Sequence, residues 1–380
     1  MQQDDLQSDG SASGGHGQFA RAIGVLENAI VARAFPGCAF GVFAGGEIIL
    51  QDARGRFTYD EGSPSVLPET AFDIASITKV ASTTATAMLL YQRGALDLET
   101  PLGELLPGFV VGRSPAEKAR LVTLRHLLAH NSGLPGYVEL FRTETTPSAL
   151  MQACLQLPIE AGPGTRVEYS DPGFLLLSKA LEVCLRENLA SWTQREIFQP
   201  LGMVETGFNP SSTDWPAIPP TEEDTTFRHR RIQGEVQDEN AYILGGVAGH
   251  AGLFSNIPDL LNFASAILDA VESNSSTSGR RGLFESHTVQ QFSQRQGPEG
   301  SSRALGWDTP SENSSSGSQF SSHSIGHLGF SGCSLWIDLD ARVAIALLTN
   351  RTWPDRQSQL IRELRPAFHN AVRQAMYSDS

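Results

Sequence analysis

The sequence is poor in lysine and in cysteine, and it has no long apolar run. Only three of its 380 residues are lysines, so each can be considered individually: Lys79, Lys118 and Lys179. The four cysteines are widely spaced and form no C-x-x-C pair, so we expect small buried hydrophobic side chains rather than a disulfide framework. No stretch reaches the apolar length of a membrane span, so we expect no membrane-spanning segment.

Basic residues are outnumbered by acidic ones, 28 against 42, so the formal net charge is -14. Nucleic-acid phosphates would be repelled, which excludes a nucleic-acid partner. Residues 1–17 are polar, acidic and rich in Gly and Ser, which predicts a disordered tail. The tail has neither a basic start nor an apolar core, so it is not a secretory signal. We therefore expect a cytoplasmic protein, or a periplasmic or secreted one if a leader precedes this numbering.

Apolar periodicity predicts an α+β fold. Residues 18–34 and 360–376 have helical spacing, whereas 38–51 and 334–348 each predict a β-hairpin. The middle of the chain, from about 75 to 270, is mostly helical. We expect an antiparallel sheet built from both chain ends, with flanking helices and an inserted, mainly helical region.

These elements predict a single domain over residues 18–376. Its α/β part would comprise 18–75 and 285–376, and its mainly helical part 76–284. A division into separate domains at linkers does not fit the sequence, and no solenoid-type repeat is present. Nothing in the sequence specifies an oligomeric state.

The only S-x-x-K of the chain joins Ser76 to Lys79 at the start of a helix predicted over 76–93. Residues three apart lie on one helix face. A simple N-cap would be reinforced by Glu or Gln at the third position, whereas a lysine there is disfavoured by the helix dipole by up to about 1 kcal/mol. This conflict indicates a functional pair, in which the helix start lowers the proton affinity of Lys79 so that it activates the Ser76 hydroxyl. A mere capping role for Ser76 is the alternative.

Two further groups are candidates for the same chemistry. Tyr169 lies on a loop, with Asp171 as the expected N-cap of the following helix, and its phenol could accept or relay a serine proton. His327 lies on a β-prone strand, and Gly329 would let a substrate backbone or carbonyl approach closely. The structural alternatives are a tyrosine with its hydroxyl bonded and a satisfied histidine at a sheet edge.

In this order, S-x-x-K, Tyr-Ser-Asp and His-Leu-Gly resemble the motifs of the serine β-lactamase and penicillin-binding-protein superfamily. The flanking segments are similar to its class C-type β-lactamase-related branch over roughly residues 20–370. Those segments are 123–136 (TLRHLLAHNSGLPG), 197–203 (IFQPLGM), 245–255 (GGVAGHAGLFS) and 326–351 (GHLGFSGCSLWIDLDARVAIALLTNR).

The resemblance implies a β-lactamase/transpeptidase-like fold and a serine hydrolase that cleaves an amide or ester through an acyl-enzyme. Ser76 would be the nucleophile, Lys79 and Tyr169 its proton-transfer partners, and His327 would lie on the facing strand. The backbone N–H groups of Ser76 and Phe330 would form the oxyanion hole. The resemblance implies no cofactor, and a small molecule, a peptide or a muropeptide as substrate.

Two departures from the family pattern favour its esterases, peptidases and amidases over an efficient β-lactamase. His327 stands where many members have lysine; it can donate a hydrogen bond to a substrate carboxylate, but its charge is pH-sensitive. Asp171 stands where lactamases usually have asparagine, and its anion should raise the proton affinity of Lys79 and repel a carboxylate ligand.

One subgroup of the family is similar over residues 234–255, namely the cell-wall-recycling N-acetylmuramoyl-L-alanine amidases. That similarity would place His250 and Asp238 on loops near the pocket. Three alternatives stay open: a catalytically weak or inactive member that acts as a binding protein, a true β-lactamase, and a D-Ala-D-Ala carboxypeptidase.

Two other motifs are set aside. His126 and His130 are four apart on one predicted helix, as in a metal pair, but no H-E-x-x-H surrounds them, and no metal site is expected. The glycine-rich segment 245–252 lacks the spacing of a dinucleotide loop, and we expect a turn that leads into a helix at 258–270.

Overall fold

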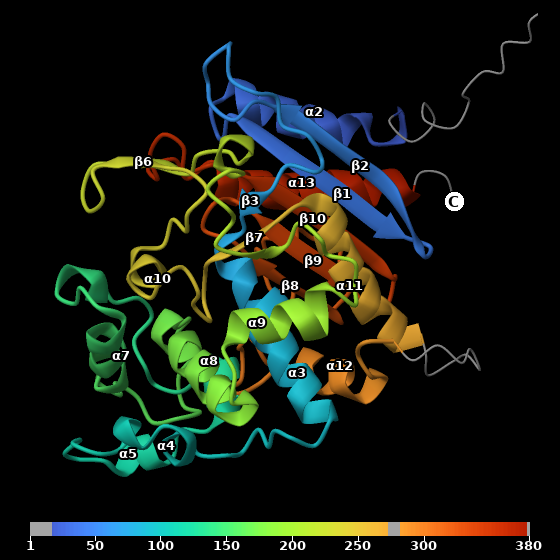
Figure 1. Cartoon of the computed structure of the whole chain (residues 1–380). Coiled ribbons are helices and arrows are strands. Elements are labelled where there is room, and N and C mark those ends of the chain that lie inside the picture. Colours follow the sequence, from blue (N-terminus) through green and yellow to red (C-terminus); the bar gives the residue numbers. More distant parts are fainter. Residues whose placement is uncertain (1–16, 273–281, 378–380) are drawn as a thin grey trace, which may run out of the picture.

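The computed structural model describes residues 17–272 and 282–377 (Figure 1). The tail expected at 1–17 therefore lies, apart from its last residue, outside the described residues. Within the described ranges, no helix is long and apolar enough to cross a membrane.

A five-stranded antiparallel sheet joins the two ends of the chain. Its strand order is β2-β1-β10-β9-β8, so β1 from the N-terminal end pairs with β10 from the C-terminal end. Both predicted hairpins are confirmed, as β1–β2 and β9–β10, and β8 is an edge strand. The strands are β1 (Gly37–Ala44), β2 (Glu47–Gly55), β8 (Ser324–Leu328), β9 (Ser334–Asp338) and β10 (Val343–Thr349).

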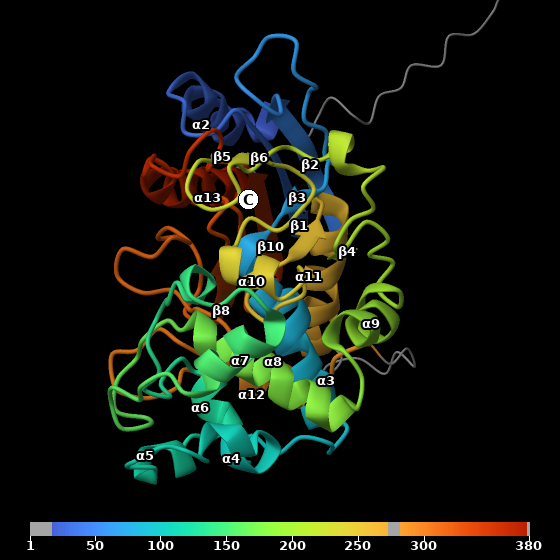
Figure 2. The ribbon, with the colours of Figure 1, turned by 60° about the vertical axis from the view of Figure 1, so that its left-hand side comes forward.

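Helices cover both faces of this sheet. On one face, α2 (Ala20–Val31) and α13 (Ile361–Tyr377) lie side by side in Figures 1 and 2 and share a hydrophobic core with β1 and β10. On the other face, α11 (Ile257–Glu272) packs against β1 and β10. This helix falls in the range predicted to form the mainly helical part, 76–284, and its apolar stripe is buried by the sheet. The division at residue 284 stays a prediction.

Short helices and small β-elements make up the rest. β3 (Phe72–Asp73), β7 (Leu253–Ser255) and β4 (Gly207–Phe208) form a three-stranded sheet, and β5 (Glu222–Asp224) pairs with β6 (Arg230–Ile232). The other α-helices are α3 (Ala85–Gln92), α4 (Leu102–Leu105), α5 (Glu117–Arg120), α6 (Leu124–Leu128), α7 (Pro147–Leu155), α8 (Asp171–Leu185), α9 (Leu189–Thr193), α10 (Glu239–Ile243) and α12 (Ser286–Ser293).

The helix predicted over 76–93 consists of three consecutive helical pieces. A 3-10 turn at Ala75–Ile77 leads to a π-helical stretch at Lys79–Thr84 and then to α3. The helical run ends at Gly94, whose φ of +66° fits the expected C-terminal glycine. Every residue of the π-helical stretch is buried, and such turns are frequent at functional sites.

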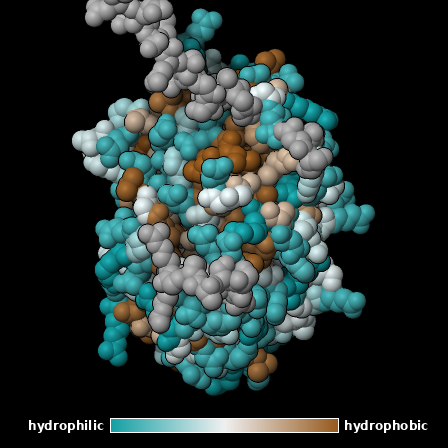
Figure 3. All heavy atoms as spheres, turned by 90° about the vertical axis from the view of Figure 1, so that its right-hand side faces the viewer, coloured by the Kyte–Doolittle hydropathy of each residue, from teal (hydrophilic) through white to brown (hydrophobic). Residues whose placement is uncertain are grey.

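Most large apolar side chains lie inside two hydrophobic cores, one on either side of the five-stranded sheet. Figure 3 shows a face on which hydrophilic side chains predominate around a small central group of hydrophobic ones. The core on the α11 side continues from the sheet through the helix of residues 79–92 to α8, so it ties the inserted helical region to the sheet.

Candidate active site

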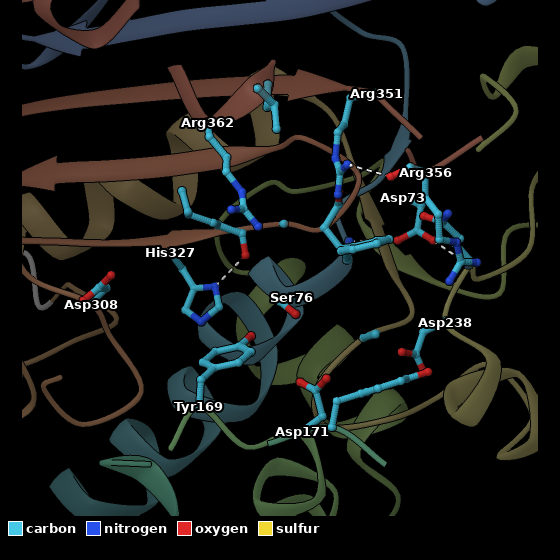
Figure 4. A pocket seen from close by; sticks show the side chains of 18 of the residues that line it. Asp73, Ser76, Tyr169, Asp171, Asp238, Asp308, His327, Arg351, Arg356 and Arg362 are labelled. Atoms are coloured by element: carbon cyan, nitrogen blue, oxygen red, sulfur yellow. Dashed lines mark hydrogen bonds between the residues drawn. The ribbon is translucent and has the colours of Figure 1, made fainter. Parts of the chain in front are cut away.

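A cleft of about 630 Å³ opens beside the end of β8 and the 3-10 turn of Ser76 (Figure 4). Apart from Lys79, the sequence predicted eight positions at or near this site, and seven of them line the cleft. These seven are Ser76, Tyr169, Asp171, Asp238, His327, Gly329 and Phe330. His250 lies behind the wall, and Lys79 is completely buried under Ser76.

The turn before Ser76 is held in an uncommon backbone conformation. Ala75 has a φ of +47°, which is unfavourable for a residue with a Cβ. The carboxylate of Asp73 accepts the N–H of Ala75 at 2.8 Å and the N–H of Gln237 at 2.8 Å, so it fixes the turn from one side. Burial raises the pKa of Asp73 to about 6, although both hydrogen bonds favour the anion.

Lys79 has an acceptor for each N–H of its ammonium group. Its Nζ lies 2.6 Å from Asp171 Oδ1, 2.9 Å from Ser76 Oγ and 3.2 Å from the main-chain oxygen of His250. An ammonium has three donors and no acceptor, so the surroundings match its charged form. Burial is the largest single effect and would lower the pKa of Lys79, but Asp171 and Tyr169 together outweigh burial and raise it.

The protonation of Lys79 corrects one prediction and confirms another. The expectation that the helix start lowers the proton affinity of Lys79 is wrong, because an ion pair at 2.6 Å is stronger than the effect of a single 3-10 turn. The expectation that Asp171 raises this affinity is confirmed.

Tyr169 lies between the lysine and the edge strand. Its ring centroid is 4.7 Å from Lys79 Nζ and 5.9 Å from the ring of His327 (Figure 4). Burial raises the pKa of the Tyr169 phenol, while the charge of Lys79 and hydrogen bonds with Lys79 and Ser76 act in the opposite direction. The phenol is therefore the protonated partner of a charged lysine.

The loop that carries Tyr169 is fixed by its neighbours. His130, whose ring contacts that of Tyr169 at a tilt with centroids 4.6 Å apart, accepts the N–H of Ser170 at its Nδ1 (3.0 Å). The N-cap of α8 is Ser170, whose Oγ accepts the N–H of Gly173 at 3.0 Å, and not Asp171 as predicted. Asp171 is the first helical residue, because its carboxylate turns to Lys79 instead of to the helix.

His327 is buried and neutral at neutral pH. Burial, together with the nearby cations Lys79 and Arg303, lowers the pKa of His327 well below its usual value. Its Nδ1 donates to the main-chain oxygen of Leu328 at 2.8 Å, which leaves Nε2 as an acceptor without a partner among the described residues. The expected pH-sensitive donor to a substrate carboxylate is therefore wrong: in this tautomer Nε2 can only accept a hydrogen bond.

Gly329 is required by the protein's own backbone. A Cβ at this position would lie 2.5 Å from the main-chain oxygen of Ile74 and 3.1 Å from Cys333 Cβ. One backbone that approaches Gly329 closely is thus the turn before Ser76. The approach of a substrate backbone stays a prediction. Among the described residues, no acceptor is recorded for the backbone N–H of Ser76 or of Phe330, so both donors predicted for the oxyanion hole are unused.

Asp238 lines the cleft and pairs with His250, which lies behind it. His250 Nε2 lies 2.9 Å from Asp238 Oδ1, which also accepts the N–H of Ala241 as the N-cap of α10. In spite of burial, His250 lowers the pKa of Asp238 to about 2. Asp238 lines the cleft as expected, while His250 supports Lys79 through its main-chain oxygen.

Sequence reasoning missed the arginines of the cleft. Arg356 pairs with Glu222 and Glu239, whereas Arg351 and Arg365 donate to main-chain oxygens and have no carboxylate partner among the described residues. The arginines that line the cleft are Arg303, Arg351, Arg356, Arg362 and Arg365. The sequence feature that could have pointed to them is the concentration of four of these arginines after residue 350 in an acidic protein.

The histidines weighed for a metal site are used separately. His126 Nδ1 accepts the N–H of Thr123 at 3.1 Å in a capping box, and His130 supports the Tyr169 loop. Segment 245–252 supplies main-chain acceptors: the oxygens of Gly249 and His250 receive Thr83 and Lys79 before the chain enters β7 and α11.

The site holds a serine that is hydrogen-bonded to a buried lysine and lies beside a tyrosine, between a sheet edge and a helical region. This arrangement defines a serine hydrolase with a β-lactamase-like fold. Comparison with known proteins agrees. The model of the Beta-lactamase family matches residues 23–366, and the chain belongs to this family.

Two curated relatives are named as an amidase and a carboxypeptidase. N-acetylmuramyl-L-alanine amidase of Bacillus subtilis (strain 168) is 30% identical over 351 residues, which cover 84% of this chain and 78% of the relative. A putative D-alanyl-D-alanine carboxypeptidase of Salmonella typhi is 30% identical over 366 residues, which cover 87% and 82%.

Solved structures share the fold. EstCE1, described as a hydrolase with promiscuous acyltransferase activity, has a TM-score of 0.71 at 21% identity and covers 92% of this chain and 99% of its own. A simvastatin synthase mutant from Aspergillus terreus has a TM-score of 0.72 at 18% identity, covering 96% and 100%. The predicted β-lactamase/transpeptidase-like fold is confirmed.

Proposed function

We propose that Ser76 is the nucleophile of this serine hydrolase and that an amide or ester is cleaved through an acyl-enzyme on its Oγ. The observation that carries the proposal is the 2.9 Å hydrogen bond from the buried Lys79 Nζ to Ser76 Oγ at the cleft, next to the ring of Tyr169. A serine hydroxyl is a weak nucleophile and requires a neighbouring group that takes its proton.

The base is the Lys79–Tyr169 pair after loss of one proton. In the resting state the pair holds an ammonium and a phenol, and neither group can accept the serine proton. Loss of one proton from the pair, whichever group releases it, creates the acceptor, so that the apparent pKa belongs to both residues.

The reaction then runs in two halves. Ser76 Oγ attacks the substrate carbonyl carbon while its proton passes to the pair, and the carbonyl oxygen becomes an oxyanion held by the N–H groups of Ser76 and Phe330. The C–N or C–O bond breaks, and the pair returns the proton to the leaving group. Water attacks the acyl ester by the same route and releases the acid and free Ser76.

For the substrate, we propose a muropeptide or another peptide amide that carries a carboxylate. The first support is the name of the Bacillus relative, an N-acetylmuramyl-L-alanine amidase. The second is the division of charge in the cleft, where Asp171, Asp238 and Glu239 can accept N–H and O–H groups and Arg351 has no acidic partner among the described residues. A carboxylate would bind on the arginine side, away from Asp171.

Labelling tests the nucleophile. A fluorophosphonate probe followed by peptide mass mapping should modify Ser76, and Ser76→Ala should lose the label and several orders of magnitude in kcat/KM. Ser82→Ala is a matched control, because Ser82 lies on the same helical run with a buried Oγ that has no partner among the described residues. Labelling of another serine, or full activity in Ser76→Ala, would refute the proposal.

A substrate panel tests the acyl donor. It should contain p-nitrophenyl esters, a chromogenic cephalosporin, D-Ala-D-Ala peptides and muramoyl peptides. We expect the highest kcat/KM for muramoyl peptides. A preference for D-Ala-D-Ala peptides or the cephalosporin would instead identify a carboxypeptidase or a β-lactamase, and inactivity on all four classes without labelling would indicate a binding protein.

A further inference from the structure

Arg365 of α13 is a buried cation without an acidic partner in the described part of the chain. Its side chain makes three hydrogen bonds, and all of them end on main-chain oxygens of one turn. Nη2 donates to Gly329 O at 2.6 Å and to Cys333 O at 2.8 Å, and Nε donates to Gly332 O at 3.1 Å. Burial lowers the pKa of Arg365 to about 10, so the guanidinium is still charged at neutral pH. Burying a charge against neutral acceptors is costly, which calls for a reason beyond packing.

The reason lies in the peptide group that Arg365 holds. Gly329 C=O and Phe330 N–H belong to the same peptide unit, and this unit is trans, since every cis bond among the described residues precedes a proline. In a trans unit the N–H points away from the C=O. Arg365 therefore binds one end of the group whose other end is the donor assigned to the oxyanion hole.

A charged donor on the carbonyl also strengthens that N–H. A hydrogen bond to the oxygen of a peptide group polarises the group, and an N–H in a low-dielectric site becomes a better donor as a result. The guanidinium lies at the carbonyl end of the unit, opposite the N–H that faces the developing oxyanion, and it acts by polarising the unit, with no carboxylate partner among the described residues.

The surrounding contacts keep the peptide unit from rotating. Gly329 N–H donates to Cys333 O at 2.7 Å, and Arg351 Nε donates to Phe330 O at 2.8 Å. Gly329 also presses against the main-chain oxygen of Ile74. The unit is thus fixed between α13 and the turn of the nucleophile.

We propose that Arg365 is a positioning residue of the oxyanion hole, which orients and polarises the 329–330 peptide group so that Phe330 N–H binds the tetrahedral oxyanion. The inference rests on the proposed function, because it takes Ser76 as the site of that intermediate.

The test compares two variants by two measurements. Arg365→Met removes the charge and all three hydrogen bonds. Arg365→Lys keeps the charge but loses the planar arrangement of N–H donors of the guanidinium. The measurements are kcat/KM for a p-nitrophenyl ester and the inhibition constant of phenylboronic acid, which forms a tetrahedral adduct with an active serine. Arg365→Met should lower kcat/KM about 10- to 100-fold and raise the inhibition constant of phenylboronic acid by the same factor. Arg365→Lys should show smaller changes in both quantities.

Arg373→Met is the matched structural control. Arg373 is a second buried arginine of α13, paired with Asp338 at 3.2 Å. Its loss should lower the melting temperature at least as much as Arg365→Met, while kcat/KM and boronic-acid inhibition change by less than about twofold; Arg373→Lys replaces it if the Met variant does not fold. Equal losses in the Arg365 and Arg373 variants, or a weaker ester rate with unchanged boronic-acid inhibition, would overturn the role of Arg365. Boronic-acid inhibition that persists in Ser76→Ala would overturn the proposed function itself, and this inference with it.

Discussion

At the scale of single residues, Asp171 decides the charge state of the site. Its carboxylate lies 2.6 Å from Lys79 Nζ and keeps the buried lysine protonated. The same anion also opposes ionisation of the Tyr169 phenol. Because the base forms only when the Lys79–Tyr169 pair loses a proton, Asp171 moves the onset of activity to higher pH.

The corresponding prediction concerns Asp171→Asn. In the parent protein, kcat/KM should fall as the pH drops through the apparent pKa of the pair, because protonation removes the base. Without the anion, both groups release a proton more readily, so the rise of kcat/KM should move to lower pH by about 1–3 pH units. Measurement of kcat/KM for an ester between pH 5 and about 10 checks this. An unshifted profile would show that Lys79 does not titrate with the reaction.

At the scale of elements, the site depends on how closely β8 meets the 3-10 turn of Ser76. Two main chains touch at Gly329, where no Cβ fits: the closest atom would be Ile74 O at 2.5 Å. Because one proposed oxyanion donor, Ser76, lies in the 3-10 turn and the other, Phe330, lies just after β8, a shift of either element would separate them.

Gly329→Ala should therefore lower kcat/KM by about 100-fold or more, since a misplaced oxyanion donor costs on this order. Gly24→Ala is the control, because Gly24 lies inside α2 with no atom within 4 Å of an added Cβ. It should keep full activity and raise the free energy of unfolding by about 0.5–1 kcal/mol. Ester kinetics and denaturant unfolding of both variants provide the comparison, and an active Gly329→Ala enzyme would argue against this packing.

At the scale of the whole molecule, one buried histidine ties the C-terminal helix to the sheet. His369 of α13 bonds Ser315 O at 2.8 Å through Nδ1 and lies 3.2 Å from Ser334 Oγ of β9 through Nε2. Burial lowers the pKa of His369 from 6.5 to about 4. At pH values between about 4 and 6.5, His369 therefore binds a proton in the unfolded chain but not in the folded one.

Folding stability should consequently decrease as the pH falls from 6.5 to about 4. This residue alone should account for about 3 kcal/mol of the decrease, because one pKa unit corresponds to about 1.4 kcal/mol. In His369→Gln, which cannot be protonated, the decrease in this interval should be smaller by that amount. Urea unfolding at several pH values measures both proteins, and parallel curves would contradict the prediction.

The sequence motifs predicted much of the site, but they could not fix its protonation. Ser76, Tyr169, Asp171 and His327 do meet at one cleft, as their order along the chain implied. The helix start was expected to lower the proton affinity of Lys79 and Asp171 to raise it, and the net pKa is raised. The histidine was expected to have a pH-sensitive charge, whereas burial lowers the pKa of His327 well below its usual value. A pKa depends on burial and on neighbours from distant segments, such as Asp171 beside Lys79, which a local pattern does not contain.

Local patterns in the chain were enough to predict two hairpins and two terminal helices from their apolar periods, and a serine and a lysine one turn apart. These features depend on residues close together in the chain. The long-range partners of each group became known from the folded structure alone. Asp171 reaches Lys79 across 92 positions and Arg365 reaches Gly329 across 36, and a local pattern does not specify contacts between residues so far apart in the chain.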